Sequence, residues 1–100
     1  MKIVVAVDAD KKTIVKKTGQ AVYYAVYEDT KPIDFIENNQ NESHGKNVLK
    51  FAGCDVILVQ AIGEHMRESI ESVGLEIKKI RKKDGVTADE AVKNFLNNNI

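Results

Sequence analysis

Two polar turns contain the residues best placed to bind a ligand. One begins at Asp8 and the other contains Ile62, Gly63 and Glu64, and each follows a continuously apolar segment. In open α/β sheets, ligands bind beyond the carboxyl ends of the strands, where the strand order reverses. Gly63 also opens a helix, whose free amide groups and dipole favour an anion. The sequence therefore predicts a ligand position at these two turns, with an anion favoured at Gly63.

Two histidines and one cysteine are the side chains that could contact a metal. His44 lies in a polar loop, His65 in the first turn of a helix, and Cys54 at the start of a strand. Their spacing matches no standard zinc pattern, so a structural site formed by the protein alone is not predicted. An incoming metallocluster needs only one or two protein ligands, and a flexible loop can close over it. His44 is therefore the predicted metal contact.

Four carboxylates keep an enzymatic alternative open. Asp8, Asp10, Glu28 and Asp55 could together hold Mg²⁺ for phosphodiester hydrolysis, as in two-metal nucleases. Each of them also has an ordinary role in a turn or at the start of a hairpin or strand, which is the stronger interpretation. No nucleophilic triad can be assigned, because triads are recognised by geometry and not by sequence order. We therefore expect a protein that is not an enzyme, with a divalent-metal-dependent nuclease as the alternative.

Length and composition indicate one domain over residues 1–100. The chain has 15 Lys+Arg, 15 Asp+Glu and 43% hydrophobic residues, which is enough for a single core. Its formal net charge is +0, so no global field steers it toward nucleic acid or an anionic membrane. The longest apolar run is far shorter than a membrane-spanning helix, and no signal peptide is recognisable. Because one cysteine cannot form an internal disulfide, we expect a cytoplasmic protein.

The first half of the chain predicts three main strands. They cover segments 2–7, 21–27 and 33–37. The first is apolar and β-branched throughout, which is typical of a central strand buried on both faces. The other two are expected to pair as an antiparallel hairpin through a turn over 28–32, in which Pro32 has its φ preset. A short strand over 13–15 and a loop over 16–20 precede this hairpin.

The second half of the chain alternates helices and strands. Helices are predicted over 48–52, 62–73 and 88–96, and strands over 54–60 and 75–80. Gly53 and Gly74 are expected to end the first two helices, and Thr87 with Glu90 forms a capping box for the third. This order predicts an α/β layer with one mixed sheet, in which the strands 2–7 and 54–60 are parallel neighbours.

Lys78–Lys83 is the only concentrated basic segment. Such a run usually lies on a solvated sheet edge, where lysines prevent pairing with other chains. An anionic partner could also dock on it. A protein-interaction module with a vestigial ligand site, acting through this edge or as a homodimer, is therefore an open alternative.

Short segments along nearly the whole chain form an ordered set. They are 1–8, Gly19 with Tyr23 and Tyr24, 36–38, His44 with Gly45, 54–59, Ile62 with Gly63, and 74–77. In order and spacing this set resembles the dinitrogenase iron-molybdenum cofactor biosynthesis family of nitrogenase accessory factors. The resemblance implies a ribonuclease H-like fold with a five-stranded mixed sheet and helices on its faces. It also implies a protein that binds or carries iron-sulfur or iron-molybdenum cofactor precursors without catalytic turnover.

One loop departs from the pattern of that family. Members with cofactor-binding activity typically have a His-Phe-Gly-Arg-like stretch before the aromatic strand, where this chain has Lys17–Gln20. A protonated lysine cannot ligate iron as a neutral imidazole does, but it can pair with an anionic cluster. The residue at position 17 is therefore expected to contribute charge and not coordination.

The residues and the resemblance together predict one site built from strand-end loops. Its expected members are Asp8, Lys17, Gly19, Gln20, Asn39, His44, Gly45, Ile62, Gly63 and Glu64. Lys17 is expected to pair with negative charge, His44 to contact metal, and the amides around Gly63 to donate hydrogen bonds. The expected ligand is a transiently bound metallocluster precursor or another small anionic molecule.

Overall fold

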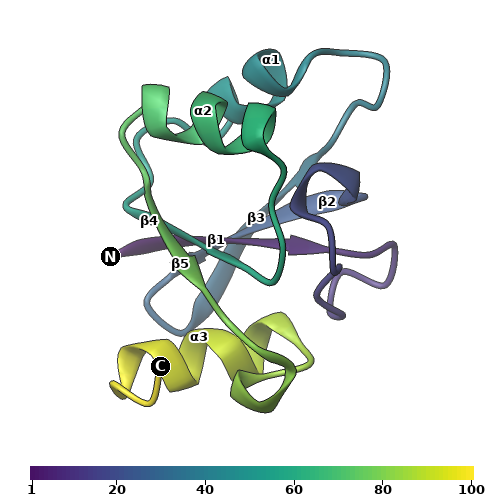
Figure 1. The fold of residues 1–100 in the computed structure, drawn as a ribbon. Coiled ribbons are helices and arrows are strands. Elements are labelled where there is room, and N and C mark those ends of the chain that lie inside the picture. The colour runs from purple at the N-terminus through teal and green to yellow at the C-terminus, as the bar shows by residue number, and fades with distance from the viewer.

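The fold is built on one five-stranded mixed sheet. The computed structural model describes all 100 residues, with elements in the following order. They are β1 (Lys2–Val7), the 3₁₀ helix η1 (Thr18–Gln20), β2 (Tyr23–Glu28), β3 (Lys31–Glu37), α1 (His44–Leu49), β4 (Val56–Val59), α2 (Glu64–Ser72), β5 (Glu76–Lys79), the 3₁₀ helix η2 (Lys82–Asp84) and α3 (Ala88–Leu96). The strand order is β3-β2-β1-β4-β5 (Figure 1). The predicted mixed sheet is confirmed, whereas the ribonuclease H-like label stays a prediction.

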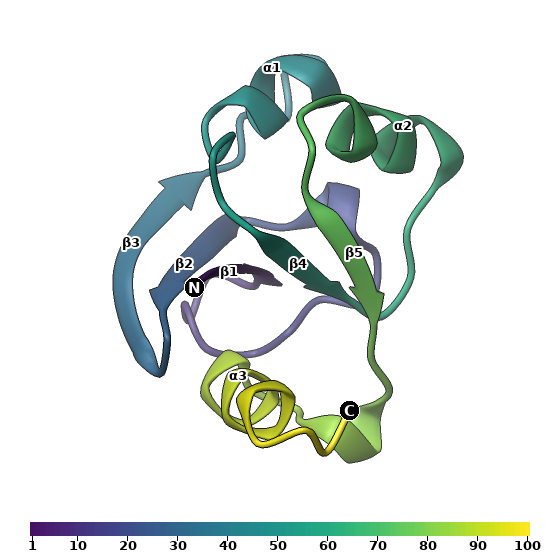
Figure 2. The same cartoon turned by 90° about the vertical axis from the view of Figure 1, so that its left-hand side faces the viewer.

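The central strand β1 determines the layers. It pairs parallel with β4, as the sequence predicted, and antiparallel with β2, and its residues Ile3 to Val7 are all buried. Alternate side chains of β1 enter two cores, because successive residues of a strand point to opposite faces. Val4 and Ala6 pack under α1 and α2, whereas Ile3, Val5 and Val7 pack on α3. Figure 2 shows the two helical layers on opposite faces of the sheet.

Local signals delimit α2 and α3 as the sequence predicted. The helix predicted over 48–52 was wrong in its bounds: α1 covers His44–Leu49, because the Ser43 hydroxyl accepts from the Lys46 amide and caps an earlier start. Gly53 and Gly74, after α1 and α2, have φ values of 95° and 86°, which glycine adopts at little cost. The Thr87 hydroxyl accepts from the Glu90 amide at 3.3 Å and so caps α3. The buried Tyr27 hydroxyl donates to Asp89, which ties the first turn of α3 to β2. None of the helices combines the length and the apolar character needed to cross a membrane.

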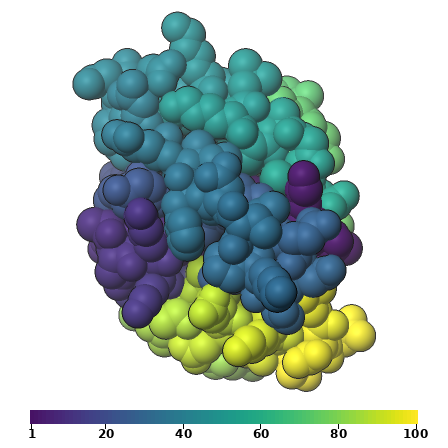
Figure 3. Space-filling model, turned by 180° about the vertical axis from the view of Figure 1, so that it is seen from behind, coloured from purple at the N-terminus to yellow at the C-terminus, as the bar shows by residue number.

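The predicted hairpin turn was wrong in its bounds, 28–32, and in containing Pro32. Pro32 lies within β3, opposite Tyr27, and the turn contains only Asp29 and Thr30. A proline is tolerated there because β3 is an edge strand, where an amide that faces solvent needs no strand partner. The register shifts between Val26 and Tyr27 at the same place. Figure 3 shows β3 and the loop after it on the surface between α1 and α3.

The segment after β1 is also less regular than predicted. Thr13 and Ile14 make only isolated bridges, to Thr87 and Val7 respectively, and so form no strand. The Ile14 amide donates to the Val86 carbonyl, which lies before α3. The segment therefore connects β1 to α3 and adds no strand to the sheet. The loop predicted over 16–20 contains the short helix η1.

Gly85 provides a test of how closely the segment before α3 packs against that helix. A Cβ atom at this position would lie 2.6 Å from the backbone nitrogen of Ala91. Because backbone atoms cannot rotate away, we expect Gly85→Ala to lower the free energy of unfolding by roughly 1–3 kcal/mol, measured by urea denaturation. Val86→Ala, at a position that is 54% exposed, is the control and should change it by at most about 0.5 kcal/mol. Equal stability of both variants would contradict this packing.

Candidate functional site

A pocket of about 590 Å³ lies where η1, the start of α1 and the start of α2 meet. Its lining, which defines the loop pocket, consists of Lys17, Thr18, Gly19, Gln20, Gln40, His44, Ala61, Ile62, Gly63, Glu64, His65 and Met66. The volume is in the range typical of small-molecule sites. The pocket lies past the carboxyl end of β4, close to the position that the sequence analysis predicted.

The loop pocket brings together most of the predicted site residues. Those that line it are Lys17, Gly19, Gln20, His44, Ile62, Gly63 and Glu64. Asp8, Asn39 and Gly45 do not line it, and their part in a ligand site stays a prediction. Asp8 is occupied in its own turn, where its carboxylate accepts from the Ala9 amide at 2.7 Å. Asn39 likewise accepts from the Asn41 amide at 2.9 Å.

Two lining residues with useful side chains were not assigned to the site from the sequence. Gln40 donates to the Ala21 carbonyl at 3.0 Å, and this bond holds its loop next to η1. His65 is the second residue of α2 and therefore lies beside Glu64 at the mouth of the pocket. The sequence signal that could have assigned His65 to the site is its place in the first turn of the helix that begins beside Gly63. No sequence pattern indicated that Gln40 would reach across to η1.

The strap Lys16–Thr18 forms one wall of the loop pocket. Thr18 is buried, and both its amide and its hydroxyl donate to the Ala61 carbonyl, at 3.0 Å and 2.9 Å. The Ala61 amide in turn donates to the Lys16 carbonyl at 2.9 Å. These bonds attach the strap to the residues that follow β4. The backbone at Lys17 is thereby fixed at the edge of the pocket.

Tyr24 connects two walls of the pocket through the core. Its hydroxyl donates to the Thr18 carbonyl at 3.2 Å, and its ring packs against Phe51 with centroids 4.8 Å apart. Phe51 follows α1, so one side chain contacts both the strap and the α1 region. Burial raises the pKa of Tyr24 above its ordinary value, and the phenol therefore remains a neutral donor.

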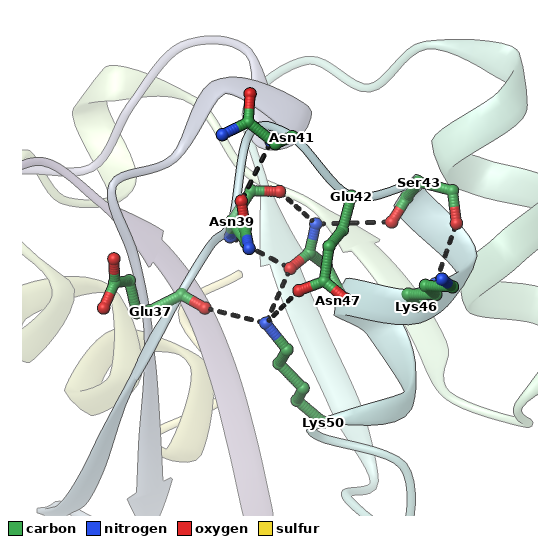
Figure 4. Close-up of polar contacts among 8 residues, drawn as sticks. All are labelled: Glu37, Asn39, Asn41, Glu42, Ser43, Lys46, Asn47 and Lys50. Atoms are coloured by element: carbon green, nitrogen blue, oxygen red, sulfur yellow. Dashed lines mark hydrogen bonds and ion pairs between the residues drawn. The ribbon is translucent and has the colours of Figure 1, made fainter.

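A buried asparagine organises the loop before His44 (Figure 4). The Asn47 amide group donates to the Asn39 carbonyl at 2.8 Å and its oxygen accepts from the Asn39 amide at 3.0 Å. Lys50 adds bonds to Asn47 at 2.9 Å and to Glu42 at 3.2 Å. The loop is thus held by a hydrogen-bonded network, whereas the sequence analysis treated it as a flexible closing segment. The network fixes the start of α1 and therefore the position of His44.

His44 lies directly against Gly19. A Cβ atom built on Gly19 would come within 2.9 Å of the His44 Cε1 atom and 3.5 Å of its Nε2 atom. Only a residue without a side chain therefore allows the imidazole to occupy this place. Gly19 consequently leaves the space in which the His44 ring lies, a role that residue spacing in the sequence did not reveal.

Replacing Gly19 tests this contact. We expect Gly19→Ala to displace the His44 imidazole while changing the free energy of unfolding by at most about 0.5 kcal/mol, because the clashing group is the end of a side chain. The readout is the NMR signals of the His44 ring, with the His65 ring as internal reference. Gly45→Ala is the control: its Cβ would come no closer than 3.9 Å to any neighbour. Equal changes of the His44 signals in both variants would contradict the close contact between the His44 ring and Gly19.

The start of α2 supplies uncapped backbone donors to the pocket. Gly63 is the N-cap of this nine-residue helix and offers no side-chain cap. The first amides of a helix have no carbonyl partner within it and carry the positive end of its dipole. A Cβ at Gly63 would meet nothing within 4 Å, so the space beside these amides is open. Lys17 and the amides favour an anion there, while Glu64 is the one acidic side chain in the lining.

The other candidate metal ligands lie apart. No group of three or more His, Cys, Asp or Glu side chains is arranged to hold a metal ion. Asp8 and Asp10 follow the carboxyl end of β1, whereas Glu28 and Asp55 lie at its other end, next to Lys2. Hydrogen bonds from the Thr13 hydroxyl and from the Thr13 and Lys12 amides lower the pKa of Asp10 to about 2. Asp8 and Asp10 therefore stabilise turns, and the four carboxylates do not come together as the nuclease alternative requires.

Cys54 is also unavailable as a ligand in the loop pocket. It precedes β4, at the end of that strand opposite to the pocket, and it is absent from the lining. Its side chain packs against the core under α1 and α2. Burial raises the pKa of the Cys54 thiol, so the protonated form is favoured.

The fold and the site define a small α/β protein with a pocket at its strand-end loops and no group of three or more side chains arranged to hold a metal ion. The family model for the dinitrogenase iron-molybdenum cofactor matches residues 1–98. The chain therefore belongs to this family, as the resemblance in the sequence predicted. A comparison with the curated proteins found no match.

Solved structures share the fold. The crystal structure of PH0822 aligns with a TM-score of 0.68 and 22% identity, covering 98% of this chain and 90% of that one. A candidate NifB protein from Thermotoga, TM1290 of the DUF35 family, aligns with a TM-score of 0.76 and 15% identity. The alignment covers 96% of this chain and 87% of that one. The apo orange protein of Desulfovibrio gigas aligns with a TM-score of 0.74 and 21% identity. The alignment covers 97% of this chain and 88% of that one. These likenesses establish the fold of the chain.

Proposed function

We propose that this chain is a non-catalytic carrier that holds an anionic metallocluster, an iron-sulfur or iron-molybdenum cofactor precursor, in the loop pocket. The observation that carries the proposal is the convergence of Lys17, His44 and the uncapped start of α2 on one pocket. Membership of the dinitrogenase iron-molybdenum cofactor family supports this class of ligand. The protein would bind its cargo without changing it chemically.

Each group has a distinct role in the proposed site. Lys17 supplies positive charge at the edge of the strap, and the first amides of α2 donate hydrogen bonds to an anionic surface. The His44 imidazole is the side chain that can coordinate a metal atom of the cargo. Its ring is positioned by Gly19 and by the Asn47 network and needs no loop closure to reach the pocket.

The ligand set favours an assembled cluster over a bare metal ion. A bare ion needs several protein donors, and although His44, Glu64 and His65 all line the pocket, no three His, Cys, Asp or Glu side chains are arranged to hold a metal ion. An assembled cluster brings its own sulfides and leaves few positions for the protein to fill. Resident iron-sulfur clusters are usually held by several cysteine thiolates, whereas this chain has one cysteine, outside the pocket. Binding through few protein ligands leaves the other faces of the cluster open to an acceptor, which is suited to a carrier.

His44→Ala tests the proposed cargo site. The purified chain is titrated anaerobically with iron, sulfide and molybdate, and retained metal is measured after desalting. We expect stoichiometric retention by the parent chain and at least a tenfold loss in His44→Ala, because the coordinating imidazole is removed. Lys46→Ala is the matched control, since it removes an exposed α1 side chain that does not line the pocket. Unchanged retention in His44→Ala would remove this residue from the site, and no retention by any chain would overturn the proposal.

Gly63→Asp separates stability from binding at the start of α2. An aspartate at this N-cap satisfies a free amide and complements the helix dipole, so we expect the free energy of unfolding to rise by about 0.3–1 kcal/mol. The same carboxylate repels an anion from the pocket, and metal retention should fall at least tenfold. Gly63→Ala, which adds no charge into the open space, serves as the control. If Gly63→Asp retains as much metal as Gly63→Ala, the α2 amides do not contact the cargo.

A further inference from the structure

A second groove, of about 290 Å³, lies on the other side of the strap. Its lining, which defines the cationic groove, is Lys16, Gln60, Ala61, Lys79, Ile80, Arg81 and Lys82. Four of these residues are cations and none is acidic. The loop pocket shares only Ala61 with this lining. The two cavities are therefore separate sites divided by the strap.

The cations of the groove lack close counter-charges. The ion pairs of the protein join the N-terminus to Asp29, Lys50 to Glu42, and Arg81 to Asp84. Lys16, Lys79 and Lys82 therefore have no carboxylate within ion-pair distance. The Arg81 pair is long, at 3.9 Å from Nε, and the Arg81 side chain is 72% exposed. Because opposite charges attract, an anion bound among these side chains would gain from all four of them.

The backbone of the groove is held firmly on both sides. On one side, the Lys16 carbonyl accepts from the Ala61 amide at 2.9 Å. On the other, the Ile80 amide donates to the Val59 carbonyl at 2.7 Å, and the Arg81 amide donates to the buried Asp84 carboxylate at 2.7 Å. The cationic side chains thus extend from fixed backbone positions. The groove also lies past the carboxyl ends of the parallel strands β4 and β5, where ligands of open α/β sheets bind.

We propose that the cationic groove binds a small, multiply charged oxyanion of the phosphate class. Arginine presents a planar fork that matches phosphate oxygens, and lysines add point charges around them. The small groove on a chain of +0 net charge favours a compact anion over an extended polyanion. The diphosphate group fits this description, either as free pyrophosphate or as part of a nucleotide. This site is independent of the cargo proposed for the loop pocket.

Calorimetric titration of the full chain with pyrophosphate at constant ionic strength tests the site. We expect saturable binding with one molecule per chain, and affinities at least tenfold lower in Lys16→Gln and in Arg81→Gln. Lys31→Gln is the control, because Lys31 lies on β3 at the opposite edge of the sheet and should leave the affinity unchanged. Binding that fails to saturate, or an equal loss in Lys31→Gln, would show only unspecific attraction to surface charge and would overturn the proposal.

Two further arms identify the source of the anion and its location. Titration with ADP is compared with pyrophosphate: tighter binding of ADP identifies a nucleotide, and binding no tighter than that of pyrophosphate identifies the free diphosphate. His44→Ala should bind pyrophosphate as the parent chain does, because His44 lies across the strap in the loop pocket. A tenfold loss in His44→Ala would place the anion in the loop pocket and overturn the groove assignment. The metal-retention assay fails or succeeds separately from this result.

Discussion

The attachment of the strap to the end of β4 is the interaction on which both cavities depend. The amide and the hydroxyl of the buried Thr18 both donate to the Ala61 carbonyl. The Tyr24 hydroxyl donates from the core to the Thr18 carbonyl. Breaking one partner would leave buried polar groups unsatisfied, which costs about 1–3 kcal/mol each. The strap is therefore a wall fixed by hydrogen bonds, with the loop pocket on one side and the cationic groove on the other.

The two cavities divide the available chemistry between them. The loop pocket combines one lysine, two histidines and free helix amides, a set that offers both coordination and hydrogen bonding to an anion. The cationic groove has only positive charge and one amide side chain, which suits an oxyanion without metal. Both lie past the carboxyl ends of strands, so the sheet topology places them together.

Local patterns were sufficient for most of the fold. The apolar run of β1, the one-faced spacing of α2 and the glycines after α1 and α2 predicted their elements, because short-range conformational preferences and burial act together there. Pro32 was misplaced, since an edge strand tolerates proline and only the complete sheet shows which strands are edges. The segment over 13–15 was overestimated because β propensity does not say whether a free partner strand exists nearby.

The sequence by itself determined which types of residue the strand-end loops carry, since these are fixed before any folding. Lys17, His44 and Gly63 were recognisable in this way, and so was the family. Only the tertiary structure decided which residues meet. It placed Asp8 outside the lining of the loop pocket and brought Gln40 and His65 into it. It also placed the His44 ring against Gly19, and it gathered Lys16 with Lys79, Arg81 and Lys82 in the cationic groove. The physical reason is that such contacts join segments far apart in the chain, whose approach depends on sheet order and long-range hydrogen bonds.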